Sequence, residues 1–226
     1  MKIFIAVPSM DQVPARFAQS LAMLRCKYDA VVGFQMGSLV WDSRTKLSQR
    51  AIRCEADYML WLDSDMEFPP DLLERLMDTL EKTPEADIVT GLYFRRVEPY
   101  SPVLFEKIQL AGPGANWKEF DQLPKEPVFE VEGCGFGAVL VPTDVIMSVT
   151  AKYGDPFWPQ NHLGEDLAFC IRARELGYHI YCDQTIKIGH VGHNVVDRDF
   201  YTFYQAQKKI REEVQRQQAE ASSSVK

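Results

Sequence analysis

Short apolar runs alternate with helix-like segments along the first 94 residues, and this alternation is the strongest constraint on the fold. The apolar runs are Ile3–Val7, Asp29–Phe34, Tyr58–Leu62 and Asp87–Phe94. Apolar side chains recur at helical spacing between them, in Pro14–Arg25, in Asp42–Glu55 and in a helix that opens at Phe68–Asp71. Continuous apolar strands are typical of a parallel sheet that crossover helices cover on both faces. The sequence therefore predicts an α/β fold with a central, mostly parallel sheet flanked by helices.

The length of the chain favours one domain with a tail. With 226 residues, 46% of them hydrophobic, the chain is long enough for one sizeable core and short for two. We expect this domain over residues 1–198. The tail, residues 199–226, is predicted to hold a surface helix over Asp199–Glu220 and a disordered end at Ser222–Ser224. Mixed charges and a thin apolar stripe favour a solvated helix, and the oligomeric state stays open.

Composition excludes several classes of protein. A net charge of −7 argues against a nucleic-acid binder, which needs clustered lysine and arginine. The five cysteines are scattered without a CxxC pair, so reduced thiols are favoured over disulfides or a zinc site. The N-terminal apolar run is too short for a secretory signal, and no stretch approaches the roughly 20 apolar residues of a membrane span. We expect a cytoplasmic protein with no transmembrane segment.

The second half of the chain has weaker patterns. Residues 95–127 are rich in proline, glycine and charge, and are interpreted as a long excursion that covers a site. A strand is expected over Val128–Val141, although Gly133, Gly135 and Gly137 interrupt it. These glycines do not open a helix, which excludes a Rossmann phosphate loop; they are expected to leave room for a substrate, or to form a β-bulge. A helix over Leu167–Leu176, a strand over Tyr178–Cys182 and a loop over residues 188–193 follow.

Two carboxylates follow the apolar strand Tyr58–Leu62. Asp63 and Asp65 are two residues apart, so in an extended backbone both side chains project to the same side. Such hard oxygen donors suit Mg²⁺ or Mn²⁺, which commonly complete their shell with phosphate and water. The alternative is an ordinary acidic turn. Because open parallel sheets bind ligands beyond the carboxyl ends of their strands, the position favours a metal site.

Two further groups have both a structural and a functional interpretation. Glu165 and Asp166 precede a predicted helix, where acidic residues are stabilised by the helix dipole, but one of them is also a candidate general base. His190 and His193 lie in a loop rich in glycine. Each histidine has two interpretations: a hydrogen-bonded side chain with no catalytic role, or a metal ligand.

Together these motifs resemble the GT-A-fold glycosyltransferases, in particular the small family-2-like enzymes of bacteria and phages. The resemblance covers roughly residues 1–197. It lies in the strand that ends in Leu62-Asp63-Ser64-Asp65, in the glycine-rich strand near Gly135, in Gly164-Glu165-Asp166 and in Ile188-Gly189-His190-Val191-Gly192.

The resemblance assigns roles to particular residues. Asp63 and Asp65 match the DxD ligands of the metal and diphosphate, with Ser64 between them in the nucleotide site. His190 matches a histidine that completes the metal shell. The ED pair makes Asp166 the catalytic base, with Glu165 as the alternative. The nucleotide base or ribose is expected to meet Pro8 and Ser9, and Arg44 corresponds loosely to a basic residue near the nucleotide.

The implied activity is transfer of a sugar from a nucleoside-diphosphate sugar, UDP- or GDP-linked, to an unknown acceptor hydroxyl. It depends on Mn²⁺ or Mg²⁺ and inverts the anomeric carbon. One alternative is a haloacid-dehalogenase-like phosphatase, which also uses DxD; there, however, the pair normally ends the N-terminal strand and Thr or Val follows it, whereas Met66 follows here. Another alternative is a non-catalytic nucleotide-binding module.

Overall fold

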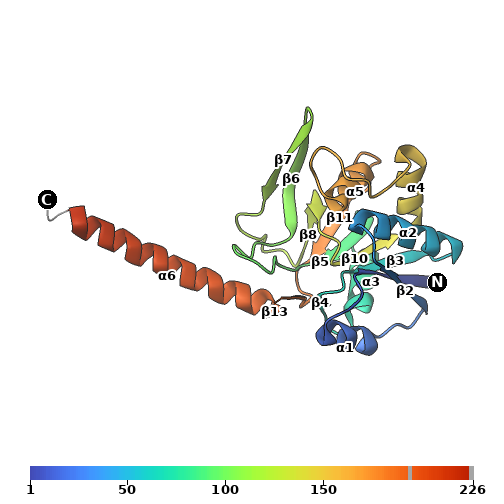
Figure 1. The fold of residues 1–226 in the computed structure, drawn as a ribbon, viewed down its shortest axis with the longest axis horizontal. Helices are drawn as coiled ribbons and strands as arrows, with labels where there is room; N and C mark the ends of the chain where they lie inside the picture. Colours follow the sequence, from blue (N-terminus) through green and yellow to red (C-terminus); the bar gives the residue numbers. More distant parts are fainter. Residues whose placement is uncertain (193–194, 224–226) are drawn as a thin grey trace.

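A seven-stranded sheet forms the centre of the structure, a computed structural model that describes residues 1–192 and 195–223 (Figure 1). Its strand order is β2-β1-β3-β10-β5-β11-β8. In chain order these strands are β1 Lys2–Ser9, β2 Asp29–Met36, β3 Tyr58–Leu62, β5 Ile88–Gly91, β8 Val128–Val131, β10 Ala138–Pro142 and β11 Ile180–Asp183. Only β10 and β8 run antiparallel to their neighbours. The predicted α/β fold with a mostly parallel sheet is confirmed.

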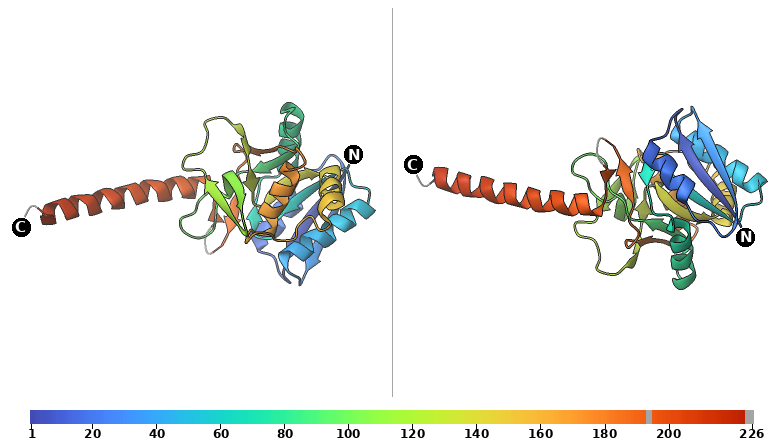
Figure 2. Two further views of the ribbon diagram at one scale, coloured as in Figure 1. Left: turned by 90° about the horizontal axis from the view of Figure 1, so that it is seen from above. Right: turned by 90° about the horizontal axis from the view of Figure 1, so that it is seen from below.

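Side chains of the sheet alternate between two cores. In β1, Ile3 and Ile5 belong to one buried cluster, and Phe4 and Ala6 to the other. The Ile3 cluster includes residues of α1 (Ala15–Met23) and α3 (Leu72–Lys82). The Phe4 cluster includes residues of α2 (Val40–Arg53), α4 (Thr143–Tyr153) and α5 (Glu165–Arg174). Helices thus cover both faces, as Figure 2 shows, and the loops at the strand ends remain available for a site.

Two small sheets lie beside the main one. The first joins β4 (Met66–Glu67), β12 (Gly189–Val191) and β13 (Val195–Val196). The predicted loop over residues 188–193 is therefore wrong in part, because residues 189–191 pair with β4 and β13. His193, one of the two candidate metal ligands, lies outside the described residues.

The second small sheet, β7-β6-β9, takes up residues 104–119 of the predicted excursion. Its strands are β6 (Leu104–Ala111), β7 (Gly114–Glu119) and β9 (Gly133–Cys134). A tight turn joins β6 to β7, and Gly112 adopts a φ of +58°, which favours glycine. The strand character expected over Val128–Val141, with interruptions at the glycines, is confirmed as three short strands, β8, β9 and β10.

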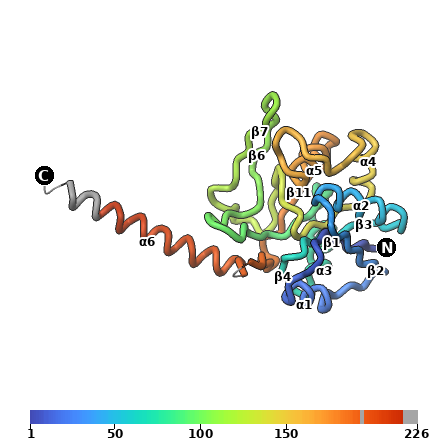
Figure 3. The backbone as a smooth tube through the Cα atoms, viewed as in Figure 1, coloured from blue at the N-terminus to red at the C-terminus, as the bar shows by residue number. Residues whose placement is uncertain are grey.

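Helix α6 (Arg198–Ser223) projects from the body as one long rod (Figures 1 and 3). It contains the predicted surface helix and extends to Ser223, and disorder at the end of the chain stays a prediction. Ser224 lies outside the described residues. Among the described helices, none has the length and apolar character needed to cross a membrane.

Candidate active site

A pocket of about 310 Å³ opens beyond the carboxyl ends of β1 and β3. All the site residues predicted from the sequence line it: Pro8, Ser9, Arg44, Asp63, Ser64, Asp65, Glu165, Asp166 and His190. Met10, Ser38, Val40, Ser43, Tyr93 and Phe136 complete the wall. The structure therefore brings together residues that lie up to 182 positions apart, and their chemical roles remain predictions.

The local backbone explains how the acidic residues enter the pocket. The amide of Asp63 donates to the carbonyl of Gly137 at 3.1 Å, which continues the pairing of β3 with β10. The amide of Met66 then donates to the Asp63 carbonyl at 3.2 Å, so a tight turn follows and β4 begins. Asp63, Ser64 and Asp65 thus form the turn at the strand end. Pro8 and Ser9 are the last residues of β1 itself rather than a turn beyond it.

Arg44 joins the two acidic motifs. Its Nη2 donates to Oδ1 of Asp63 at 2.9 Å, and its Nε donates to Oε1 of Glu165 at 3.1 Å. The guanidinium also lies 5.6 Å from the ring centroid of Trp61 and 5.3 Å from that of Phe136. Burial lowers the pKa of Arg44, but the carboxylates of Asp63, Glu165 and then Asp166 outweigh burial and raise it. Arg44 is therefore a fixed cation within the site, and direct contact with a nucleotide stays a prediction.

Asp65 receives two nitrogen donors on one oxygen. Nη1 of Arg96 lies 2.6 Å from Oδ2, and Nε2 of His190 lies 3.3 Å from the same atom. Burial raises the pKa of Asp65, but the hydrogen bond and charge of His190, and then the charge of Arg96, outweigh it and lower the pKa. Asp65 is accordingly held as a carboxylate.

The orientation of His190 is set by its other ring nitrogen. Nδ1 lies 2.9 Å from the carbonyl oxygen of Phe94, which only accepts, so Nδ1 carries a proton. This leaves Nε2 directed at Asp65. Burial lowers the pKa of His190, but Asp65 outweighs that effect and raises it. The ring of Tyr93 packs edge-on against the imidazole at 5.7 Å.

Asp166 stands at the first turn of α5. Its Oδ1 accepts a hydrogen bond of 2.8 Å from the amide of Leu167. Burial raises the pKa of Asp166 to about 6, and the charge of the adjacent Glu165 acts in the same direction. A base performs best when its pKa is close to the working pH, so this carboxylate is suited to accept a proton. Glu165, by contrast, is tied to Arg44.

Tyr93 fills the space that the glycine-rich strand was expected to offer to a substrate. A Cβ atom at Gly135 would lie 2.1 Å from the Tyr93 hydroxyl, and one at Gly137 would lie 2.8 Å from its Cζ. The hydroxyl instead accepts a hydrogen bond of 3.1 Å from the Gly137 amide. The substrate interpretation of these glycines is therefore wrong: they admit the tyrosine, which lines the pocket.

Two of the predicted metal ligands fit a cation that also binds phosphate. Asp65 and His190 are in contact and offer the oxygen and nitrogen donors that such ions accept. Asp63 faces the same pocket, although one of its oxygens is engaged by Arg44. Within residues 1–192 and 195–223, no set of three or more His, Cys, Asp or Glu side chains is arranged to hold an ion. A cation at Asp65 would therefore need phosphate oxygens or water to complete its shell.

Arg96, which bonds Asp65, and Tyr93, which contacts His190, are among the site residues that sequence reasoning missed. Both follow directly from β5 (Ile88–Gly91), whose carboxyl end lies near that of β3 because β5 and β3 flank β10. The pair Arg95-Arg96 after a predicted strand was an available signal. The weak periodicity of residues 95–127 concealed it.

One family model matches part of the chain. The model of glycosyl transferase family 2 matches residues 49–137. The matched segment contains Asp63, Asp65, Tyr93 and Arg96, whereas Asp166 and His190 lie beyond it. No curated protein matches the chain.

Solved structures share the fold. A197 from STIV superposes with a TM-score of 0.61 at 18% identity, over 85% of this chain and 86% of its own. GalNAc-T7 with UDP, GalNAc and Mn²⁺ superposes at 0.60 and 9% identity, over 85% of this chain and 44% of its own. S. aureus TarS residues 1–349, in complex with UDP-GlcNAc, gives 0.50 at 15% identity, over 80% and 56%. The chain thus spans about half the length of the last two.

Proposed function

We propose that this chain, a family-2-like glycosyltransferase of the GT-A fold, transfers a sugar from a nucleoside-diphosphate sugar to an acceptor hydroxyl, depends on Mn²⁺ or Mg²⁺, and inverts the anomeric carbon. The observation that carries the proposal is the meeting of two acidic motifs in one pocket. Asp63 and Asp65 stand at the end of β3, Glu165 and Asp166 stand at the start of α5, and Arg44 bonds one member of each pair.

The donor would occupy the β1 and β3 side of the pocket. Pro8 and Ser9 line the wall there and are proposed to meet the base or ribose, with Ser64 nearby. Asp65 and His190, with Asp63 beside them, would hold the cation against the diphosphate. When bound, that cation would stabilise the negative charge that develops on the departing diphosphate. A UDP-linked donor is proposed first, because GalNAc-T7 and TarS are both described with uridine nucleotides.

Asp166 would act on the acceptor. Its carboxylate is held through Oδ1 by the Leu167 amide. The Oδ2 atom is then proposed to take the proton of the acceptor hydroxyl as that oxygen attacks the sugar, on the face opposite the diphosphate. The neighbouring Glu165 is committed to Arg44, which favours Asp166 as the base.

A thermal-shift screen with UDP-, GDP-, CDP- and dTDP-linked sugars, each with and without Mn²⁺, tests the donor proposal. A ligand of the folded state raises the unfolding temperature, so we expect a rise for one nucleotide class only when Mn²⁺ is present. Transfer is then measured with that donor and a panel of hydroxyl acceptors. A generic phosphate ester is the control for a phosphatase. Phosphate release from that ester, or nucleotide binding without transfer to any acceptor, would overturn the proposal.

A further inference from the structure

Arg96 bonds the oxygen of Asp65 that also lies nearest His190. Its Nη1 lies 2.6 Å from Oδ2, the same oxygen that Nε2 of His190 approaches to 3.3 Å. A guanidinium and a divalent ion repel each other, so the two compete for one carboxylate oxygen. Binding of an ion between Asp65 and His190 therefore favours the departure of Arg96 from this oxygen.

Backbone hydrogen bonds close the loop that carries Arg96, whereas half of its side chain is exposed to solvent. The Arg95 amide donates to the Ser101 carbonyl at 2.9 Å, and the Tyr100 amide donates to the Val97 carbonyl at 2.8 Å, which closes a short loop. The Arg96 side chain is 51% exposed. A long, exposed side chain on a closed loop can exchange partners without any change in the fold.

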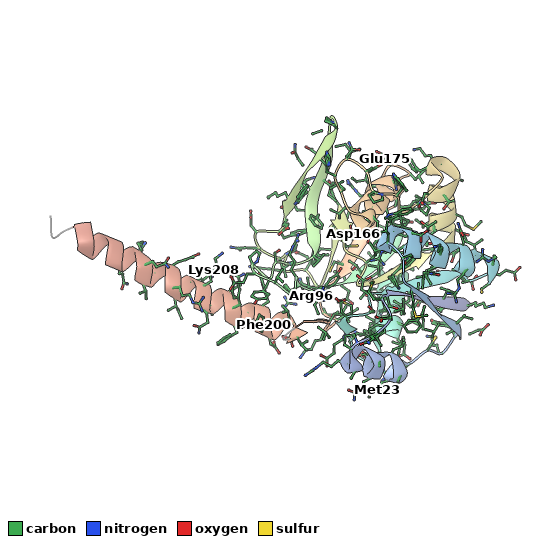
Figure 4. All side chains as sticks on the ribbon, in the orientation of Figure 1. Met23, Arg96, Asp166, Glu175, Phe200 and Lys208 are labelled. Carbon is green, nitrogen blue, oxygen red and sulfur yellow. The ribbon has the colours of Figure 1, made fainter. Side chains whose placement is uncertain are left out.

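Helix α6 holds this loop in place. The ring of Phe94 stacks on Tyr201 with centroids 4.4 Å apart. Tyr100 packs edge-on against Phe200 at 5.0 Å and against Tyr204 at 4.8 Å. Figure 4 labels Arg96 and Phe200 where the projecting helix meets the body. The base of α6 thus buttresses the segment that delivers Arg96 to the pocket.

We propose that Arg96 neutralises Asp65 in the free protein, yields that carboxylate to the divalent cation, and then pairs with the diphosphate of the donor. This inference rests on the proposed function. The planar guanidinium of arginine matches two phosphate oxygens at once, and the exchange keeps its charge paired before and after the donor binds. One side chain would therefore both restrain metal binding in the absence of donor and support the diphosphate in its presence.

The test measures Mn²⁺ and nucleotide binding by titration calorimetry, without any turnover. In the nucleotide-free protein, Arg96→Ala removes the competing cation, so we expect Mn²⁺ to bind about three- to fivefold more tightly. At saturating Mn²⁺, the same variant is expected to bind UDP about tenfold more weakly and uridine unchanged, because uridine has no phosphate. Arg96→Lys, which keeps the charge but loses the planar fork, is expected to bind Mn²⁺ as the wild type does and UDP with intermediate affinity.

Arg16→Ala is the matched control. It removes another exposed arginine–carboxylate pair, Arg16 with Glu67 at 3.2 Å, and is expected to change neither affinity. If the wild type binds Mn²⁺ and UDP but Arg96→Ala behaves like Arg16→Ala, the role of Arg96 is overturned while the proposed function stands. An equal loss of UDP and uridine binding also rejects it, since the effect would not depend on phosphate. If the wild type binds no Mn²⁺ with or without UDP, the metal-dependent function falls and this inference falls with it.

Discussion

Arg44 donates from Nη2 to Oδ1 of Asp63 over 2.9 Å, from a side chain that is only 3% exposed. Through Nε the same guanidinium reaches Glu165. The end of β3 and the start of α5 lie about a hundred residues apart in the chain, yet this one cation spans them. Arg44 of α2 therefore fixes the distance between the proposed donor site and the proposed base through its ion pairs with Asp63 and Glu165.

Arg44→Ala is expected to destabilise the protein. Removing one partner of a buried ion pair leaves the remaining charges uncompensated, which typically costs about 3–5 kcal/mol; because Asp63 is partly exposed, we expect about 3 kcal/mol. Urea denaturation measures the change. The control on the same helix is Lys46→Ala, whose exposed pair with Asp42 is screened by solvent, so we expect its unfolding free energy to stay close to that of the wild type. Equal effects for both variants would show that Arg44 does not anchor the site.

Asp65→Ala is expected to abolish both metal-dependent nucleotide binding and turnover. The variant removes the carboxylate that His190 and Arg96 both contact, so the proposed cation loses its main oxygen ligand. Calorimetry with UDP, with and without Mn²⁺, measures the loss. Asp78→Ala, which breaks an exposed pair with Lys82, is the control. Full activity in Asp65→Ala, or full activity of the wild type in a chelator, would contradict the metal role.

Asp166→Asn is expected to bind the donor normally and to transfer the sugar about 10²- to 10⁴-fold more slowly, which is the range for loss of a general base. Asparagine keeps the shape and the hydrogen bond from Leu167 but accepts no proton. Single-turnover transfer and donor affinity are measured side by side. If Asp166→Asn transfers at the wild-type rate and Glu165→Gln does not, the base is Glu165.

The raised pKa of Asp166 predicts opposite effects of pH on activity and on stability. Since this pKa is about 6 in the folded protein, transfer is expected to fall about tenfold per pH unit below 6.

An unfolded aspartate titrates near 3.9, so between these two values the folded state holds the proton more tightly, and stability declines as pH rises through that window. Asp166→Asn is therefore expected to be more stable than wild type at pH 7, by on the order of 1–3 kcal/mol, and to lose that advantage near pH 4. Denaturation curves of both proteins across this range measure the difference; a constant difference would contradict the assignment.

The parts of the fold that follow local patterns were accessible from the sequence. The strand Tyr58–Leu62 is uniformly apolar and two aspartates follow it, so both the strand and the place of Asp63 and Asp65 at its carboxyl end follow from short-range patterns. The expected extended backbone at these aspartates is wrong, because they lie in a turn. Helix α4 was not predicted, although its sequence has a comparable pattern: Val145, Ile146 and Val149 share its buried face at helical spacing.

The missed features depend on contacts between distant segments. Arg96 meets Asp65 because residues 94–100 pack against Phe200, Tyr201 and Tyr204, which lie about a hundred residues further along the chain. The role of Gly135 likewise depends on Tyr93, which reaches it across the sheet. No periodicity within one segment encodes such pairings.

Gly164→Ala is expected to impair catalysis more than stability. A Cβ atom at this position would lie 2.9 Å from Oδ1 of Asp166, so the methyl group must displace the carboxylate. The backbone at Gly164 has a φ of −62°, which any residue adopts, and replacing glycine by alanine at a helix N-cap costs less than about 1 kcal/mol.

Gly177→Ala is the converse control, because its φ of +90° strains an alanine while no heavy atom lies near the added Cβ. We expect Gly164→Ala to lower the transfer rate with donor affinity preserved, and Gly177→Ala to lower the unfolding free energy by about 1 kcal/mol with the rate preserved. Wild-type turnover in Gly164→Ala would show that the position of the Asp166 carboxylate does not limit transfer.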